Sequence, residues 1–179
     1  MRIISGKRKG GKLFEVESEK TRSTTDRVKE SLFNIIGPFF DGGVALDFFA
    51  GSGSLCIEAL SRGVDFAYFF DKEDLPIKVI KKNIEKFDFN NASCVKQVDF
   101  EQALSYVDKN VDLVFLDPPY HYGFVDKCLK NLKLSKKMND KCMIVCEVEK
   151  NETFNYEGFR FVDERTYGRI KIVILEWRI

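Results

Sequence analysis

The sequence has few of the residues that hold metals or close disulfide frameworks. It contains one histidine, His121, and five cysteines, none of which form a C-x-x-C pair. This spacing does not match that of zinc ligands, and an odd number of cysteines argues against a disulfide scaffold. We therefore expect no metal site, and most of the thiols should pack as small apolar residues in the core.

The sequence also lacks any long apolar run. Its first ten residues, MRIISGKRKG, contain no apolar segment typical of signal peptides, and no stretch approaches the length needed to span a bilayer. We expect a cytoplasmic protein that has no membrane partner. With 179 residues, 44% of them hydrophobic, the chain is long enough for one substantial core and short for two. The prediction is a single domain over residues 1–179.

The sequence has no large excess of either charge, since its formal net charge is only +1. The charges are, however, unevenly distributed along the chain. Residues 1–30 contain nine lysines and arginines against five acidic residues, which leaves a mildly acidic remainder. A basic end on such a body suits a polyanionic partner that is met through one face. A solvated, lysine-rich surface without a partner is the alternative.

Apolar strand patterns and helical patterns alternate along most of the chain. Residues 1–17 predict two short strands around a turn at Gly10-Gly11, and the helix that follows can be capped by Thr24 or Thr25. From residue 44 onward, strands and helices alternate through five strands. The final segment, GFRFVDERTYGRIKIVILEWRI, breaks this rhythm and predicts two strands with no helix between them.

This order of elements predicts an α/β fold. Near-continuous apolar strands separated by helices are typical of a parallel sheet that is covered on both faces. We expect such a sheet to close with an antiparallel C-terminal hairpin. Residues 1–40 would form a basic hairpin and a helix in front of a core at residues 41–179.

Four aspartates fall at or just beyond the ends of predicted strands: Asp47, Asp71, Asp99 and Asp117. In an open parallel sheet, ligands bind beyond the carboxyl ends of the strands. Acids scattered at random over a surface would not follow strand ends so regularly. The sequence therefore predicts a ligand site at this edge of the sheet.

A glycine loop, DFFAGSGS, lies between the first strand of the core and its helix. Gly51 and Gly53 would let a ligand approach the backbone, and the start of the helix would offer unpaired N–H groups to an anion. The third glycine of the dinucleotide fingerprint is absent, because Cys56 occupies its place. A ligand that carries a carboxylate is therefore favoured over a pyrophosphate, and a nicotinamide-dependent dehydrogenase is disfavoured.

The acids that follow the next two strands suit a nucleoside. Asp71 lies where an acid would accept hydrogen bonds from both ribose hydroxyls, and Asp99 could accept from an adenine amino group with Phe100 against the ring. A nucleoside with an amino-acid tail fits this set, which predicts S-adenosylmethionine as the cofactor. The alternative for each acid is a helix cap or an exposed loop residue.

The stretch VFLDPPYHY ends a buried strand with an acid, two prolines and an aromatic ring. The Asp117 carboxylate and the Pro118 carbonyl can both accept hydrogen bonds from an exocyclic NH2 group and so orient its lone pair. Consecutive prolines fix φ and remove donors, and Tyr120 offers a face on which an extruded base can stack. The pattern predicts methylation of an amine, and a proline-rich turn without chemistry is the alternative.

Taken together, the segments VALDFFAGSGSLCIEALSRG and FLDPPY, with the acid at Asp71, resemble class I S-adenosylmethionine-dependent methyltransferases. With MRIISGKRKGGKL and TRSTTDRVKESLFNII in front, nearly the whole chain is similar to the bacterial RsmD family. The resemblance implies a Rossmann-like, seven-stranded fold. It also implies methylation of the N2 amine of a guanine in 16S ribosomal RNA, within the small ribosomal subunit or an assembly intermediate.

The resemblance also implies roles for residues at matching positions. The cofactor-binding set would be Asp47, Phe49, Gly51, Gly53, Asp71, Asp99 and Phe100. The catalytic loop would be Asp117, Pro118, Pro119 and Tyr120. The residues that bind RNA would be Lys7, Arg8, Lys9, Lys12, Arg22, Thr25 and Arg27. The chain departs from the family pattern at Ser23, where proline is usual, and at Asp71, where glutamate is common; the shorter acid weakens the ribose assignment.

Three alternatives stay open on the sequence alone. An adenine-N6 DNA methyltransferase could use the same D-P-P-Y loop, although 179 residues leave little room for a target-recognition domain. A glutamine-N5 protein methyltransferase is less favoured, because its motif normally begins with asparagine. A non-catalytic RNA-binding domain is opposed by the intact glycine loop and acids.

Overall fold

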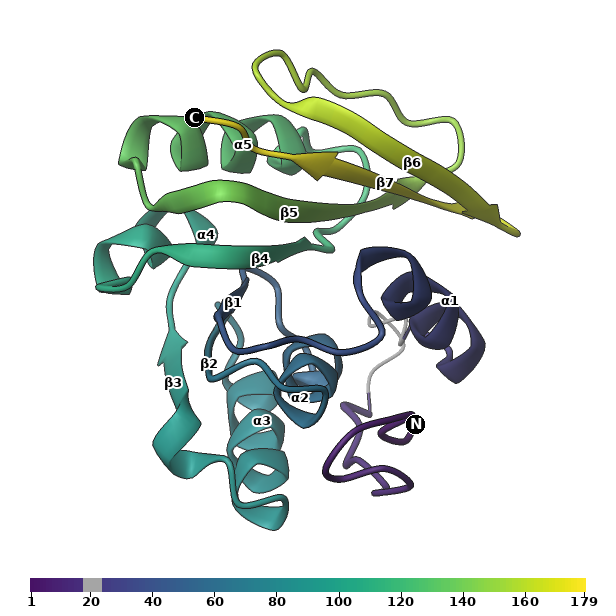
Figure 1. Cartoon of the computed structure of the whole chain (residues 1–179), viewed down its shortest axis with the longest axis vertical. Coiled ribbons are helices and arrows are strands. Elements are labelled where there is room, and N and C mark those ends of the chain that lie inside the picture. Colours follow the sequence, from purple (N-terminus) through teal and green to yellow (C-terminus); the bar gives the residue numbers. More distant parts are fainter. Residues whose placement is uncertain (18–23) are drawn as a thin grey trace.

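The computed structural model describes residues 1–17 and 24–179. Its centre is a seven-stranded sheet in the order β3-β2-β1-β4-β5-β7-β6 (Figure 1). The strands are β1 (Val44–Asp47), β2 (Phe66–Asp71), β3 (Ser93–Gln97), β4 (Val111–Leu116), β5 (Met138–Glu149), β6 (Arg160–Tyr167) and β7 (Ile170–Glu176). Strands β1 to β5 are parallel to one another, and β7 pairs antiparallel with both β5 and β6. The predicted fold class is confirmed, including the C-terminal hairpin.

Helices cover both faces of the sheet. The helices are α1 (Asp26–Ile36), α2 (Ser54–Ser61), α3 (Asp74–Lys86), α4 (Phe100–Ala103) and α5 (Phe124–Ser135), with short 3-10 turns at Asn90–Ala92 and Leu104–Tyr106. One hydrophobic cluster joins α1, α2 and α3 to one face, and a second joins α4 and α5 to the other. Neighbours such as Ala45 and Leu46 belong to different clusters, because successive side chains of a strand point to opposite faces. Burial on both faces explains why the strands are almost continuously apolar.

Helix α1 starts after Thr25, one of its two predicted caps. The Thr25 hydroxyl accepts a hydrogen bond from the Val28 amide at 3.3 Å, and Gly37 ends the helix at φ 141°. Its buried face consists of Val28, Lys29, Leu32 and Phe33. The apolar side chains of Ile35 and Ile36, in the last turn, are only half-buried. Phe33 takes the central place because it packs on Phe115 of β4, with ring centroids 6.1 Å apart.

The N-terminal segment differs from its predicted structure. Residues 1–17 form no regular strands; a single antiparallel bridge joins Arg2 to Lys12. A few backbone hydrogen bonds accompany this bridge, such as the one from the Ile3 amide to the Gly11 carbonyl at 2.8 Å. Between them, amides of the segment bind α2: for example, the Lys7 amide donates to the Ser61 carbonyl at 2.7 Å. Helix α2 ends at Ser61 with Arg62 as its cap, and Gly63 follows directly.

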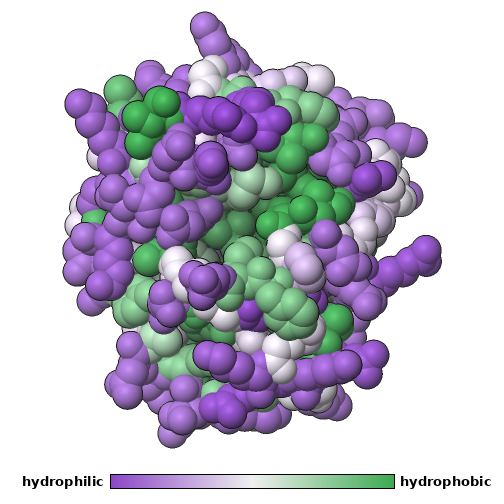
Figure 2. All heavy atoms as spheres, viewed as in Figure 1, coloured by the Kyte–Doolittle hydropathy of each residue, from purple (hydrophilic) through white to green (hydrophobic). Residues whose placement is uncertain are grey.

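The hairpin of β6 and β7 extends past the rest of the sheet and ends beside α1 (Figure 1). A hydrogen bond between the hydroxyls of Tyr167 and Ser31 joins the end of β6 to α1. Hydrophilic atoms dominate the margin of this face of the molecule, and apolar atoms are visible nearer its middle (Figure 2). Within residues 1–17 and 24–179, no helix combines the length and apolar character needed to cross a bilayer.

Candidate active site

The parallel strands bring three of the four predicted acids to one edge of the sheet. Asp47 and Asp71 are the last residues of β1 and β2, and Asp117 directly follows β4. Since β2, β1 and β4 are adjacent, the three carboxylates lie along the same edge of the sheet. Asp99 lies two residues beyond β3, one strand further out.

The glycine loop connects β1 to α2 in a tight left-handed turn. Gly53 has φ 82° and precedes the first residue of α2, and a Cβ at this position would meet Phe69 and Ile57 side-chain atoms at 3.2 and 3.3 Å. Gly51 has φ 56°, but a Cβ built on it would meet nothing within 4 Å. The backbone of Gly51 therefore faces open space that a ligand could occupy, whereas Gly53 is required by packing.

The carboxylate of Asp71 ties the glycine loop to the start of α3. One oxygen accepts a hydrogen bond from the Gly51 amide at 3.1 Å, and the other accepts from the Glu73 amide at 3.0 Å. Burial raises the pKa of Asp71, and these amide bonds oppose the rise. A carboxylate with about four acceptor sites keeps capacity for the hydroxyls of a ribose.

Asp47 is almost fully buried beneath the same loop. Its carboxylate accepts a hydrogen bond from the Phe49 amide at 3.0 Å. Burial, assisted by the nearby charge of Asp71, raises the pKa of Asp47 to about 7. Asp47 therefore titrates near neutrality and could exchange protons or pair with a cationic group at that pH.

Asp99 and Phe100 lie at the start of α4. The Asp99 carboxylate accepts a hydrogen bond from the Glu101 amide at 3.0 Å and so caps the helix, as the structural alternative predicted. Phe100 packs against Phe49, with ring centroids 5.5 Å apart, and against Phe124 at 4.9 Å. Tyr122 stacks on the outer side of Phe124 at 5.4 Å. The predicted cofactor residues Phe49 and Phe100 are thus brought together in an aromatic cluster beside the loop.

The D-P-P-Y loop follows β4 on the side of the sheet that carries α1. Asp117 is partly exposed, Pro118 is buried, Pro119 is exposed and Tyr120 is half-buried against the α1 side of the core. Burial of the Asp117 carboxyl, together with the charges of Glu147 and Asp47, raises its pKa well above the ordinary range. The motif therefore holds an acid at the junction of β1, β4 and β5.

His121, which directly follows the motif, connects the loop to β5. Its Nε2 atom contacts a carboxylate oxygen of Glu149, and its backbone has φ 68°. This contact fixes the far end of the D-P-P-Y loop against the neighbouring strand.

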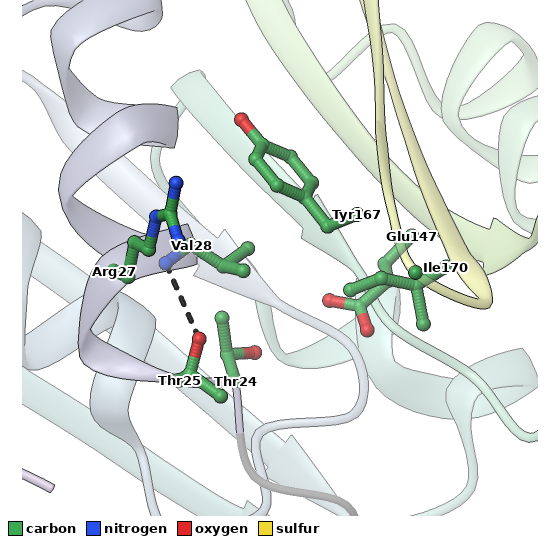
Figure 3. Close-up of a pocket in the computed structure, with 8 residues that line it drawn as sticks. Thr24, Thr25, Arg27, Val28, Glu147, Tyr167 and Ile170 are labelled. Carbon is green, nitrogen blue, oxygen red and sulfur yellow. Dashed lines mark hydrogen bonds between the residues drawn. The ribbon is translucent and has the colours of Figure 1, made fainter.

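A pocket of about 440 Å³ lies between α1 and the β6–β7 hairpin (Figure 3). Its lining comes from the start of α1, from β5 and from the β6–β7 hairpin: Thr24, Thr25, Arg27, Val28, Glu147, Tyr167, Gly168 and Ile170. The Glu147 carboxylate points into this space, towards Thr24 and Val28 (Figure 3). Sequence reasoning missed Glu147, although an acid within the apolar strand CMIVCEVE was a signal that could have found it.

A buried ion-pair network holds α1 and the N-terminal segment on α2. The Lys29 ammonium lies 3.4 Å from one Glu58 oxygen, and the Arg62 Nε atom lies 2.8 Å from the other. Glu58 also accepts from the amides of Ile4 and Ser5 at 2.9 and 3.0 Å. Lys29 donates to the hydroxyl of Ser54, the first residue after the glycine loop, at 3.1 Å. The network therefore links the start of the chain to the loop.

The basic tip, which we define as Lys7, Arg8 and Lys9, lies away from this edge. The amides of Lys7 and Arg8 donate to Ser61 at the end of α2, and the Arg8 guanidinium donates at 2.9 Å to the carbonyl of Phe87, the residue that caps α3. These helices begin near the carboxyl edge and run about 12 and 20 Å away from it, at 1.5 Å per residue. Positive charge near helix C-termini is also favourable to the fold itself.

The other predicted RNA-binding residues are divided between several places. Lys12 is exposed at the bridge to Arg2. Thr25 caps α1 and, with exposed Arg27, lines the pocket. Arg22 lies outside the described residues. In the part of the chain that the structure describes, no three His, Cys, Asp or Glu side chains gather as they would around a metal ion.

The sheet order, the glycine loop on β1, the acid that ends β2 and the D-P-P-Y loop after β4 define a methyltransferase of the Rossmann-like class. Comparison with known proteins narrows this class. The family model described as "Conserved hypothetical protein 95" matches residues 1–176, so the chain belongs to this family, the RsmD family of methyltransferases.

Relatives and a solved structure agree with this assignment. "Putative rRNA methyltransferase YlbH" of Bacillus subtilis is 39% identical over 99% of this chain and 100% of its own. "Ribosomal RNA small subunit methyltransferase D" of Haemophilus influenzae is 33% identical over 94% of this chain and 89% of its own. The structure titled "Putative methyltransferase yhhF from Escherichia coli" superposes with a TM-score of 0.84 at 28% identity, covering 99% of this chain and 98% of that one. The family and the fold imply S-adenosylmethionine as the cofactor.

Proposed function

We propose that this chain methylates the exocyclic N2 amine of a guanine in 16S ribosomal RNA of the small subunit, with S-adenosylmethionine as the donor. The observation that carries the proposal is the position of Asp117 and Pro118, at the end of β4 and one strand from the glycine loop. The names of the relatives supply the class of substrate, since several are called small subunit rRNA methyltransferases. These names favour RNA methylation over the DNA methyltransferase, the protein methyltransferase and the non-catalytic alternatives.

The residues at the sheet edge fit the cofactor. The open space beside Gly51 and the N-terminus of α2 would take the methionine part, with Asp47 and Phe49 below it. Asp71 would accept from the ribose, and Asp99 and Phe100 would lie against the adenine. When bound, S-adenosylmethionine supplies an electrophilic methyl group.

The chain's own contribution to the reaction is orientation of the amine. The N2 lone pair of guanine is delocalised into the ring, which makes the amine a poor nucleophile. Hydrogen bonds from the NH2 group to the Asp117 carboxylate and the Pro118 carbonyl would hold the group and stabilise the positive charge that develops on it. Tyr120 would stack on the base after it leaves its helix.

The proposed RNA contacts lie around this site. Thr25 and Arg27 would hold RNA at the pocket, and Lys7, Arg8, Lys9 and Lys12 would contact phosphates further along the strand. Because the basic tip lies at the far ends of α2 and α3, it would bind nucleotides distant from the target. Arg22 would also contact RNA, as the resemblance to the family implies.

The test is to incubate the protein with labelled S-adenosylmethionine and, separately, unmodified small subunits, naked 16S rRNA and DNA. We expect label in the ribosomal RNA, and mass spectrometry of the digested RNA should locate one methyl group on guanine N2. Methylation of adenine in DNA, or of no nucleic acid at all, would contradict the proposal.

A further inference from the structure

The acid that adjoins the catalytic loop is placed to read the target base. We propose that Glu147 is a specificity-determining residue that accepts a hydrogen bond from N1–H of the guanine whose N2 amine is held by Asp117 and Pro118. The inference rests on the proposed function and goes beyond it, because it explains why this D-P-P-Y site would take guanine and reject adenine.

The register of the sheet places Glu147 beside Asp117. In the parallel ladder of β4 and β5, Leu116 pairs with Cys146, so the next residues on the two strands are Asp117 and Glu147. Val145 of β5 and Phe115 of β4 belong to the cluster on the α1 side, and residues two positions further along point to the same face. The charge of Glu147 acts on the Asp117 carboxyl more strongly than that of Asp47 does.

The surroundings of Glu147 are those of a binding pocket. Glu147 is only 8% exposed, yet its carboxylate lines the pocket between α1 and the β6–β7 hairpin. The volume, about 440 Å³, lies within the range of about 300–1,000 Å³ that is usual for small-molecule sites. Val28 and Ile170 supply apolar walls, and Tyr167 supplies an aromatic edge (Figure 3). An ionised carboxylate has about four acceptor sites, so a contact with the protein leaves capacity for a ligand.

The chemistry of the two purines explains why such a site would accept guanine and reject adenine. In guanine, the N2 amine is adjacent to N1–H, so two donors lie side by side on the Watson–Crick edge. In adenine, the N6 amine is adjacent to N1, which is an acceptor. An acid beside the amine-holding pair would bind the first arrangement and repel the second. A site built around a hydrogen bond rejects an analogue that lacks the donor, because a buried acceptor is then left unpaired.

The test uses 2-aminopurine, which keeps the N2 amine of guanine and lacks N1–H. Small subunits would be reconstituted with 16S rRNA that carries guanine, 2-aminopurine or adenine at the methylated position, and single-turnover rates would be measured by mass spectrometry. We expect the wild-type protein to prefer guanine over 2-aminopurine by at least about 100-fold. In Glu147→Ala this preference should fall below about tenfold, because the variant should methylate guanine more slowly. In Glu147→Gln the ratio should also fall, because the amide N–H can donate to N1 of 2-aminopurine.

The matched control is Glu149→Gln. It removes a second carboxylate from the same strand, two residues further on, where it contacts His121 and does not line the pocket. This variant should keep the wild-type preference whatever its absolute rate. Calorimetry should show that both Glu147 variants still bind S-adenosylmethionine.

The outcomes separate this inference from the function on which it rests. Wild-type protein that methylates 2-aminopurine as fast as guanine overturns the inference and leaves guanine methylation intact. The same holds if both Glu147 variants retain the full preference, or if both lose cofactor binding, which would place Glu147 in the cofactor pocket. If the wild-type protein methylates no guanine in any substrate, the proposed function itself fails.

Discussion

The Lys29 ammonium and the Glu58 carboxylate form an ion pair at 3.4 Å in which both side chains are completely buried. Lys29 comes from α1 and Glu58 from α2, so the pair joins the N-terminal extension to the helix that follows the glycine loop. Burial lowers the pKa of Lys29, and the carboxylate of Glu58 opposes this effect. The segment TTDRVKE is thus bound to the core through Lys29, which looks like a surface lysine in the sequence.

We predict that Lys29→Met lowers the free energy of unfolding by about 3 kcal/mol, since removing one partner leaves a buried charge less well compensated. Arg62 and two backbone amides remain on Glu58 and limit the loss. Urea unfolding measures the change. Lys78→Met is the control, because Lys78 pairs with Asp74 on the surface of α3 and should cost less than about 1 kcal/mol. Equal effects of the two substitutions would refute a special role for Lys29.

We predict that Asp117→Ala slows methyl transfer by about 100-fold or more, because the amine loses one of the two acceptors that orient it. Binding of S-adenosylmethionine, measured by calorimetry, should persist. Loss of cofactor binding would instead assign Asp117 to the cofactor pocket.

The titration of Asp47 predicts a pH dependence of stability. Its pKa is raised to about 7 in the folded protein, so the native state binds this proton more tightly than the unfolded chain does. Its contribution to stability is therefore greatest at low pH and falls as pH rises between about 4 and 7, by at most about 1.4 kcal/mol per pH unit. Asp47→Asn has no such titration, so the wild type should lose stability relative to it over this range. Unfolding at several pH values measures the difference, and a constant difference would contradict the burial argument.

Charge reversal in the basic tip should weaken RNA binding without slowing the chemical step. Lys7→Glu and Lys9→Glu remove positive charges that would bind phosphates far from the target. The slope of log K against log salt should therefore flatten by about 0.7–0.9 for each phosphate that is no longer neutralised. Arg8 is left in place because it donates to the Phe87 carbonyl and supports the fold. Lys130→Glu, an exposed reversal on α5, is the control that should leave the slope unchanged. Unaltered slopes in the tip variants would show that RNA does not bind there.

Much of the fold could be predicted because a sheet that is buried on both faces requires almost continuously apolar strands. The ends of α1 are likewise marked by the local chemistry of Thr25 and Gly37. The acids at the carboxyl edge could be predicted for the same reason, since strand ends fix their place. Glu58 could not be assigned from sequence, because its partner Lys29 is 29 residues away. Glu147 stands out as an acid in an apolar strand, but its neighbour Asp117 is 30 residues away, so the sequence does not show that the two carboxyls lie together. The N-terminal segment forms one antiparallel bridge in place of the two predicted strands, because the amides of Ile4, Ser5 and Lys7 find partners on α2, which no local pattern reveals.

The central claim is that the methyl donor and the amine-holding pair meet where β1 and β4 end. A crystal structure of the protein with S-adenosylmethionine tests this most directly. We expect the amino-acid part at Gly51 and the methyl group directed at the space in front of the Asp117 carboxylate and the Pro118 carbonyl, where a guanine N2 atom could approach to about 3–3.5 Å. A donor bound at another edge of the sheet, or with its methyl group turned away from this pair, would contradict the account.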